Sequence, residues 1–465
     1  MARPAFTHSR LACEELIIDV PQVMEPLEWP ECCIHRVPKL LRKVNRDAYT
    51  PKLISIGPLH HGKKDLKDME MLKLRYFKDF CFRTGKCQKE LASIIEDNEI
   101  NIRHCYAEAS RLSSKEFVRM ILLDGIFIIE LFLRKSEKYE GDYILSKPLL
   151  TNHIMEDLIL LENQLPFFIL RELHERFSPP IQGKSTTPFL ELAWKCLPQV
   201  PKTPSRDSTV KEVKHFTDLL RTFYCPSKPD GENKPEPTSL LCCATKLDVE
   251  KEAGTNSLLY SATKLDQAGV EFKGVSKRPL LDIEFKKLPL LKYFPCYNFS
   301  WLLACLPCLK RLKCLVKVQP TLEVPQFVVD DAAECLYRNL VALEQCHYPT
   351  EAYICDYIML WDALINTEKD VDLLVEKKVI VNKLGHNEAV ADLVNKLCEQ
   401  TAENDHSYFH ALAQKLHAHY DNSWNRHMAS LTSAYFPDIW KGTATIVGLI
   451  ILGFTLWGFI SPPSK

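Results

Sequence analysis

Residues 117–133, FVRMILLDGIFIIELFL, decide whether most of this chain is embedded in a membrane or folded as a globular body. The stretch has nearly the length of a membrane span, but Arg119, Asp124 and Glu130 interrupt it. Charged side chains at membrane depth are costly, so the stretch predicts a buried helix of a folded body. Because Asp124 lies one turn from apolar residues on either side, its carboxylate must be paired or protonated.

A second apolar run, LILLENQLPFFIL at residues 158–170, is too short to span a bilayer and is broken by Pro166. It carries three polar residues among apolar neighbours, and the earlier segment ISIGPLHHG contains two adjacent histidines before its last residue. The polar residues embedded in apolar segments are His60, His61, Asp124, Glu130, Glu162, Asn163 and Gln164.

Two interpretations of these polar residues are open. If Asp124 or Glu162 faced His60 or His61 in a cleft, general acid–base chemistry would be conceivable. Alternatively, the same side chains tie irregular segments to helices by bonding with arginines or with backbone groups freed by prolines, and we favour this interpretation. The expected partners are Arg36, Arg75 and the backbone around Pro58 and Pro166. We name His60, His61, Asp124 and Glu162 as a possible buried polar cluster.

Periodic apolar residues extend the helical prediction over much of the chain. Their spacing of three and four between Leu66 and Phe80 is typical of an amphipathic helix, and further helices are expected near 90–110, 115–134 and 152–176. Three short runs, AGVEFKG, RPLLDIEF and TLEVPQFVV, are the only plausible strands. The predicted fold class is mainly α, a large helical body with a small β element and one C-terminal transmembrane helix.

The C-terminal third is predicted to be strongly helical. Thr367 followed by Asp370 resembles a capping box, and Asn387 can cap the next helix. A long final helix over residues 409–424 is expected to join the body rigidly to the segment that follows it.

The run TATIVGLIILGFTLWGFI at residues 443–460 carries no charge and predicts a transmembrane helix about 27 Å long. We therefore expect a single-pass protein that meets membrane lipid at this end and keeps its body in the cytosol, while the choice between plasma membrane and endomembrane stays open. The predicted membrane-anchor residues are Thr443, Ile446, Val447, Leu449, Ile450, Ile451, Leu452, Phe454, Leu456, Trp457, Phe459 and Ile460.

Composition argues against several classes of function. The formal net charge of -1 is unlike that of a basic nucleic-acid binder. No phosphate-binding glycine loop, zinc-protease helix or Gly-x-Ser-x-Gly elbow is present. The 18 cysteines occur without a secretory signal, so free thiols in a reducing compartment are expected. The spacing of Cys305, Cys308 and Cys314 is not that of a zinc site. The sequence predicts no catalytic residue, no metal and no cofactor.

A set of segments in fixed order carries a family resemblance. They read IHRVPKLLRKVNRDAYTPKLISIGPLHHG, MILLDGIFIIELF, DLILLENQLPFFIL, SATKLDQAGVEF, LYRNLVALEQCHY and DALINTEKDV. From about residue 32 to the C-terminus the chain resembles the plant proteins called domain of unknown function 247. The resemblance implies a plant-specific, mostly uncharacterised protein that usually ends in a membrane segment and has no agreed catalytic residues. Certain grass members look like determinants of self-incompatibility, which favours recognition over chemistry.

These patterns divide the chain into an N-terminal extension at residues 1–31, a helical family domain at 32–436 and a membrane anchor at 437–465. Within the domain, residues 224–238 are expected to be a linker. Residues 286–320 form an insertion that departs from the family pattern and is either a membrane-touching loop or untranslated sequence retained in the gene model.

The leading functional hypothesis is a membrane-anchored component of protein interaction, recognition or signalling. The alternative is a membrane-associated enzyme that uses the buried histidine and carboxylate residues. A third possibility, suggested by the insertion, is an inert paralogue or a defective gene product. The protein partner and the oligomeric state stay open.

Overall fold

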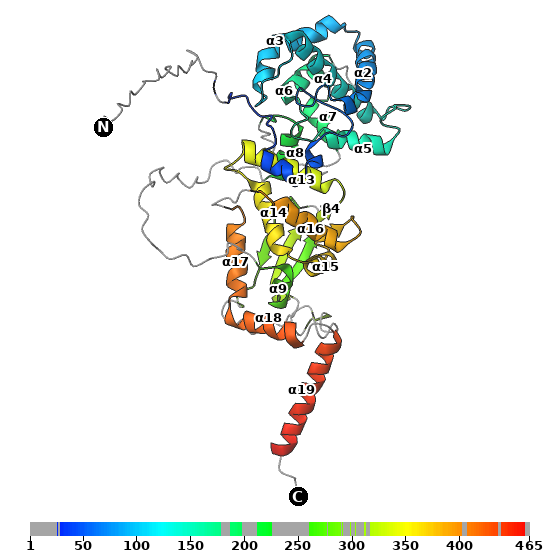
Figure 1. Ribbon diagram of the computed structural model, residues 1–465. Helices are drawn as coiled ribbons and strands as arrows, with labels where there is room; N and C mark the ends of the chain where they lie inside the picture. The colour runs from blue at the N-terminus through cyan, green and yellow to red at the C-terminus, as the bar shows by residue number, and fades with distance from the viewer. Residues whose placement is uncertain are drawn as a thin grey trace, which may run out of the picture.

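The computed structural model describes residues 26, 28–177, 187–197, 212–225, 260–276, 278–289, 291, 298, 303, 311–312, 317–401, 407–435 and 439–460. Figure 1 shows an elongated molecule with a helical lobe at one end, a mixed lobe of helices and short strands, and a single helix that projects away at the C-terminal end. The fold is mainly helical with a few short strands, which confirms the coarse part of the predicted fold class.

The first lobe is built around one central helix. Its elements are α1 (Lys39–Val44), η1 (Asp47–Tyr49), η2 (Lys64–Leu66), α2 (Asp68–Thr84), α3 (Gln88–His104), α4 (Ser114–Glu137), α5 (Pro148–Asp157), α6 (Phe167–Phe177), α7 (Phe189–Cys196) and α8 (Phe216–Tyr224). Helices α2, α3, α6 and α7 all pack against α4. A helix that is packed on several sides needs apolar side chains over most of its surface, and most of the buried residues of α4 are apolar.

The sequence fixes α4 locally as well. A capping box starts the helix, in which Glu116 N donates to the Ser113 hydroxyl at 3.4 Å and the Glu116 carboxylate accepts from Ser113 N at 3.1 Å. Gly125 lets α6 come close, because an added Cβ would lie 3.3 Å from a Leu173 methyl carbon. The prediction of a buried helix over residues 117–133 is confirmed, with Asp124 and Glu130 buried.

The second lobe combines short strands with helices. Its elements are α9 (Ala262–Gln267), β1 (Glu271–Val275), β2 (Glu284–Lys286), β3 (Thr321–Pro325), β4 (Phe327–Val329), α13 (Ala333–His347), α14 (Tyr353–Leu364), α15 (Glu368–Glu376), β5 (Ile380–Asn382), α16 (Asn387–Cys398), α17 (His410–Tyr420) and α18 (Ser423–Tyr435). The three predicted apolar runs supply β1 to β4, as expected. The sequence prediction missed β5, because three residues are too few to show an alternating pattern.

The strands form two small sheets. In the first, β3 lies between β1 and β2, parallel to β1 with Phe272 opposite Leu322 and antiparallel to β2. In the second, β4 pairs in parallel with β5, with Phe327 opposite Ile380. A single hydrophobic core runs from the first lobe into the second, and α13 packs against both η1 and α8. The two lobes are therefore one folded body.

One predicted helix is wrong as a continuous element. Residues 152–176 form α5 and α6 with an irregular segment, residues 158–166, between them. Pro166 disfavours helical backbone at the residue before it. The side chains of Asn163 and Gln164 also bond to nearby carbonyl groups, which competes with helical hydrogen bonding.

The predicted long helix over residues 409–424 is also wrong, because α17 and α18 meet at a sharp corner (Figure 1). Asn422 starts the second helix, since its side-chain oxygen accepts from Trp424 N at 3.1 Å. The capping box of Thr367 and Asp370 at α15 is confirmed. Asn387 is the first residue of α16 rather than its cap, and its side chain contacts Asn382 and Asp372 instead.

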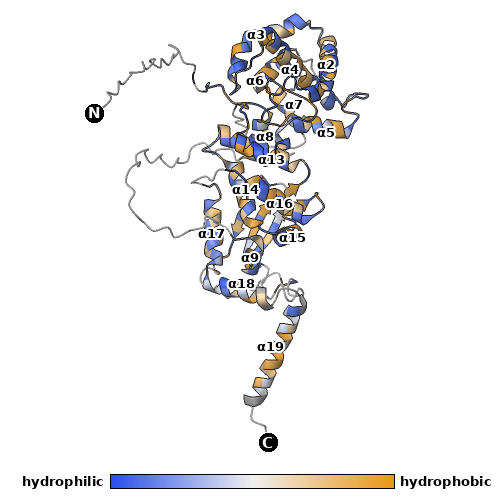
Figure 2. Ribbon diagram, viewed as in Figure 1, coloured by the Kyte–Doolittle hydropathy of each residue, from blue (hydrophilic) through white to orange (hydrophobic). Residues whose placement is uncertain are grey.

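Helix α19 (Ile439–Ile460) projects from the end of α18 and is largely hydrophobic in Figure 2. Across the helices that the structure describes, none combines the length and the hydropathy that crossing a bilayer requires. The expected transmembrane helix is therefore not supported. Most of the extension at 1–31, the linker at 224–238 and the insertion at 286–320 lies outside the described residues.

Gly274 of β1 offers a test of the packing between the two sheets. A Cβ added there would lie 1.8 Å from the carbonyl oxygen of Lys378, so the backbones would have to separate. We expect Gly274→Ala to lower the free energy of unfolding by about 3 kcal/mol, at the upper end of overpacking costs. Urea unfolding followed by circular dichroism measures this loss. Lys273→Ala, on the exposed face of the same strand, should stay near wild type, and equal stability of the two variants would contradict the close approach.

Candidate functional site

The segment between α5 and α6, residues 158–166, is irregular yet buried, and we call it the polar loop. Its backbone cannot satisfy itself as a helix does, so side chains take over. Gln164 Nε2 donates to the carbonyls of Leu158 at 2.6 Å and Leu160 at 2.8 Å. Asn163 Nδ2 donates to the carbonyl of Asp157 at 2.9 Å. The polar residues of the sequence motif therefore hold the shape of the loop.

A second irregular segment, residues 51–60, lies against the polar loop and takes its hydrogen bonds from buried side chains. The carboxylate of Asp157 accepts from the N–H groups of Lys52, Leu53 and Ile54 at 2.9, 2.7 and 2.9 Å. Asn163 accepts from Ile56 N at 2.7 Å. We call residues 51–60 the wrapping segment, because they cross the first lobe between the polar loop and α4.

Asp124 holds the next part of the wrapping segment. Its carboxylate accepts from Gly57 N at 2.9 Å and from Lys73 Nζ of α2 at 2.6 Å. Lys73 is fully buried and also donates to the carbonyl of Ser55 at 2.6 Å. Burial alone would lower the pKa of Lys73, but the charges of Asp124 and Glu70 raise it overall, so the ammonium stays charged. Asp124 is thus paired, as expected, with Lys73 as its partner instead of an arginine.

Glu162 forms a separate charged site at the edge of the polar loop. Its carboxylate accepts from Val37 N at 2.8 Å, forms an ion pair with Arg42 and lies 3.5 Å from Arg36 Nη1. Burial raises the pKa of Glu162, but the nearby His60 ring, the charge of Arg42 and the Val37 N–H outweigh it and lower the pKa to about 2. Arg36 is therefore a partner, as the sequence suggested.

The two histidines behave differently from each other. His60 is buried, and its Nε2 lies 3.4 Å from the Glu162 carboxylate, although within the part of the chain that the structure describes neither ring nitrogen has a hydrogen-bond partner. Burial lowers the pKa of His60, so the ring is neutral near pH 7. His61 is exposed. The possible buried polar cluster is thus divided: His60 joins Glu162, Asp124 joins Lys73, and His61 joins neither.

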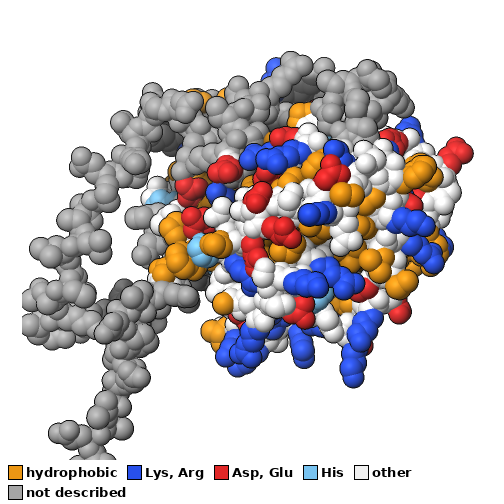
Figure 3. All heavy atoms as spheres, turned by 90° about the horizontal axis from the view of Figure 1, so that it is seen from above, with side chains coloured by type: hydrophobic (Ala, Val, Ile, Leu, Met, Phe, Trp, Pro, Cys, Tyr) orange, Lys and Arg blue, Asp and Glu red, His pale blue; other side chains and the backbone are white. Residues whose placement is uncertain are grey.

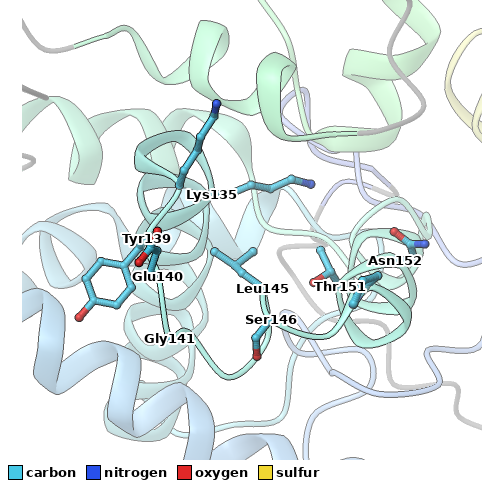
Figure 4. Close-up of a pocket in the computed structure, with 10 residues that line it drawn as sticks. Lys135, Tyr139, Glu140, Gly141, Leu145, Ser146, Thr151 and Asn152 are labelled. Carbon is cyan, nitrogen blue, oxygen red and sulfur yellow. The ribbon is translucent and has the colours of Figure 1, made fainter.

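The first lobe also has a shallow pocket of about 560 Å³ between the end of α4 and the start of α5. Figure 4 shows the residues that line it, most of which carry a polar or charged group. Among the residues described, His60, His61, Asp124 and Glu162 do not line this pocket. The residues that line it are Lys135, Lys138, Tyr139, Glu140, Gly141, Leu145, Ser146, Pro148, Thr151 and Asn152. The pocket therefore gives the candidate acid–base residues no route to a substrate.

A further grouping escaped the sequence prediction. Glu28, Cys32 and His35 place one possible ligand atom each within 4.8 Å of one another. The signal that could have revealed them is the spacing Cys32-x-x-His35, which is common at metal sites. Glu28 precedes this pair in a stretch without a clear pattern.

The predicted membrane-anchor residues lie on α19. Most of their described side chains are exposed, with Phe454 at 73% and Trp457 at 72%, whereas Ile446 is half-buried. The side chains of Phe459 and Ile460 lie outside the described residues. The exposed apolar residues are Val447, Leu449, Ile450, Ile451, Leu452, Phe454, Leu456 and Trp457.

Comparison with known proteins gives relatives from plants. A family model described as a plant protein of unknown function matches residues 34–454. The chain is 26% identical over 443 residues to UPF0481 protein At3g47200 of Arabidopsis thaliana, covering 93% of this chain and 87% of the relative. It is 22% identical over 484 residues to the putative UPF0481 protein At3g02645 of the same plant, covering 92% and 89%. No solved structure matches the chain.

The charge of Glu162 gives a second test. In Glu162→Gln, Arg42 loses its anionic partner and Arg36 keeps only Glu108, so we expect the free energy of unfolding to fall by about 3 kcal/mol at pH 7. Because its partners hold the folded pKa of Glu162 at about 2, below the 4.5 of a glutamate in the unfolded chain, the stabilisation is complete above pH 4.5 and is lost as the pH falls toward 2. The difference between wild type and variant should therefore shrink over that range in urea unfolding of the full chain.

The matched control is Glu191→Gln on α7, which removes one exposed ion pair with Lys195. An exposed pair of this kind contributes at most about 1 kcal/mol, so this variant should stay close to wild type at every pH. A Glu162→Gln deficit that is the same at pH 2 as at pH 7 would show that the carboxylate charge is not what stabilises the fold.

Proposed function

We propose that this chain, which belongs to the plant protein family of unknown function 247, is a membrane-associated recognition or signalling protein whose folded body binds another protein. The observation that carries the proposal is α19. A helix of 22 residues that exposes apolar side chains along most of its described length is unfavourable in water. Lipid would remove that cost, so we place α19 in a membrane and the body beside it.

The body has the form expected of a scaffold for recognition. Exposed apolar side chains lie on α2 at Met71, Leu74 and Phe82, and Phe82 is 93% exposed. Their spacing of three and eight places them on one helix face, opposite the face that packs on α4. This face belongs to the lobe farthest from α19, and Figure 3 shows that end of the molecule with basic, acidic and hydrophobic side chains interspersed. A protein partner fits such a mixed surface better than a nucleic acid does.

The alternative, an enzyme that uses the buried histidine and carboxylates, has less support. His60 is 2% exposed, so a substrate could not reach it without local opening. Asp124 is held by Lys73 and Gly57 N, and Glu162 is held by arginines and Val37 N. Asp124 thus stabilises the wrapping segment and Glu162 holds residues 36–42, and either side chain would have to leave these contacts to react.

We also place the body in the cytosol. The cysteines within the described ranges are free thiols, including the exposed Cys87. Free thiols in such number are typical of a reducing compartment. The choice between plasma membrane and endomembrane does not follow from these features.

Membrane association is tested by fractionation of plant cells that express the full chain. Wild type should sediment with membranes and resist alkaline extraction. Ile450→Glu with Phe454→Glu should move the protein to the supernatant, because each charge in hydrocarbon costs about 2.5–3.5 kcal/mol. Ile100→Glu, at an equally exposed apolar position on α3, should still sediment. Wild type that stays in the supernatant of a detergent-free lysate would overturn the proposal.

The recognition role is tested by proximity labelling in living tissue. A labelling enzyme fused to the full chain should mark proteins that the same enzyme fused to residues 437–465 alone does not mark. Met71→Asp with Phe82→Asp should remove at least one of these proteins, since a charge on an apolar interface is costly. Leu149→Asp, exposed on α5, should leave the labelled set unchanged. Identical labelling by the full chain and by residues 437–465 would contradict a role for the body.

A further inference from the structure

We propose that Glu28, Cys32 and His35 form a binding site for a divalent transition-metal ion of the Zn²⁺ type. A thiol, an imidazole nitrogen and a carboxylate oxygen lie within 4.8 Å of one another, so one ion could bind all three, and these are ligand types of zinc sites. Sulfur and nitrogen ligands favour Zn²⁺ over Ca²⁺ or Mg²⁺, which prefer oxygen alone. Glu28 is exposed, whereas Cys32 and His35 are buried, so an ion could reach the two buried ligands past the carboxylate.

The backbone that carries these ligands is held in place by its own contacts. Cys32 N donates to the carbonyl of Trp29 at 2.9 Å, and the Trp29 ring stacks on His104 at the end of α3 with centroids 3.8 Å apart. The next residues, Cys33 and Ile34, donate their N–H groups to the carbonyl of Cys105 at 3.0 and 2.9 Å. Ligands on a fixed turn lose little freedom on binding, so the site is preorganised.

His35 has the environment of a metal-binding histidine. Its Nε2 lies 3.2 Å from Nδ1 of His347 on α13. When Nε2–H donates to His347, Nδ1 of His35 keeps its lone pair, and this atom lies 3.6 Å from the Glu28 carboxylate. A cation placed among these two acceptors and the Cys32 sulfur would be attracted to all three. In metal-binding histidines generally, a hydrogen bond from the ring nitrogen that does not bind the metal fixes the orientation of the ring.

Binding would replace the thiol proton of Cys32 by the metal ion. The proton leaves to solvent as the metal–sulfur bond forms, and no electron is transferred. Because His35 also contacts His347, the ion would fix residues 28–35 to α13 and hence to the second lobe. The site is thus inferred to be structural, and it is independent of the proposed membrane and recognition roles.

The test uses the full chain in detergent micelles, stripped of metal with a chelator and titrated with Co²⁺. We expect a sulfur-to-cobalt charge-transfer band that saturates and that Zn²⁺ removes. Cys32→Ser should lose this band, and His35→Gln should weaken Co²⁺ binding about tenfold or more. Cys87→Ser, at an exposed thiol away from the site, should titrate like wild type. No band in wild type, or an equal band in Cys32→Ser, would overturn the site.

The Glu28→Gln variant tests whether weaker Co²⁺ binding results from loss of a ligand and not from loss of the fold. Glu28 is exposed, so this variant should keep the wild-type circular dichroism spectrum and still bind Co²⁺ about tenfold more weakly. Unchanged Co²⁺ affinity in a folded Glu28→Gln protein would mean that the carboxylate is no ligand, and the proposed site would be wrong.

Discussion

Backbone N–H and C=O groups that are buried outside helices and strands need partners, and this chain supplies them from side chains. The wrapping segment, residues 51–60, depends on Asp157, Asn163 and Asp124 for its hydrogen bonds. The polar loop, residues 158–166, depends on its own Asn163 and Gln164. Loss of one such side chain would leave several backbone groups unsatisfied together. Each buried unsatisfied group costs about 1–3 kcal/mol.

The polar loop also connects parts of the chain that are distant in sequence. Gln164 accepts from Phe216 N of α8 at 2.9 Å, and Asn339 of α13 accepts from Leu161 N at 2.9 Å. Thr217 donates its hydroxyl to the carbonyl of Ile159 at 2.9 Å. Buried polar groups of the polar loop therefore connect this loop to α8 and α13.

Part of this arrangement could be predicted from the sequence. Charges inside residues 117–133 indicated a buried helix with a paired carboxylate, and both are present. The partner could not be chosen, because Lys73 and Arg75 are two residues apart and point to different sides of α2, so the rotation of α2 against α4 decides between them. The grouping of Glu28, Cys32 and His35 depends equally on tertiary contacts, here with α3 and α13. The apolar character of α19 was visible in the sequence, whereas the corner before α18 was set by Asn422.

Hydrogen–deuterium exchange of the full chain measures the role of these side chains most directly. The N–H groups of Lys52, Leu53, Ile54, Ile56 and Gly57 donate to buried side chains, although they lie outside any helix or strand. If these bonds hold the first lobe together, the five amides exchange as slowly as those in the middle of α4. Exchange as fast as that of the exposed turn at residues 61–64 would contradict the claim that side chains satisfy this backbone and hold the fold.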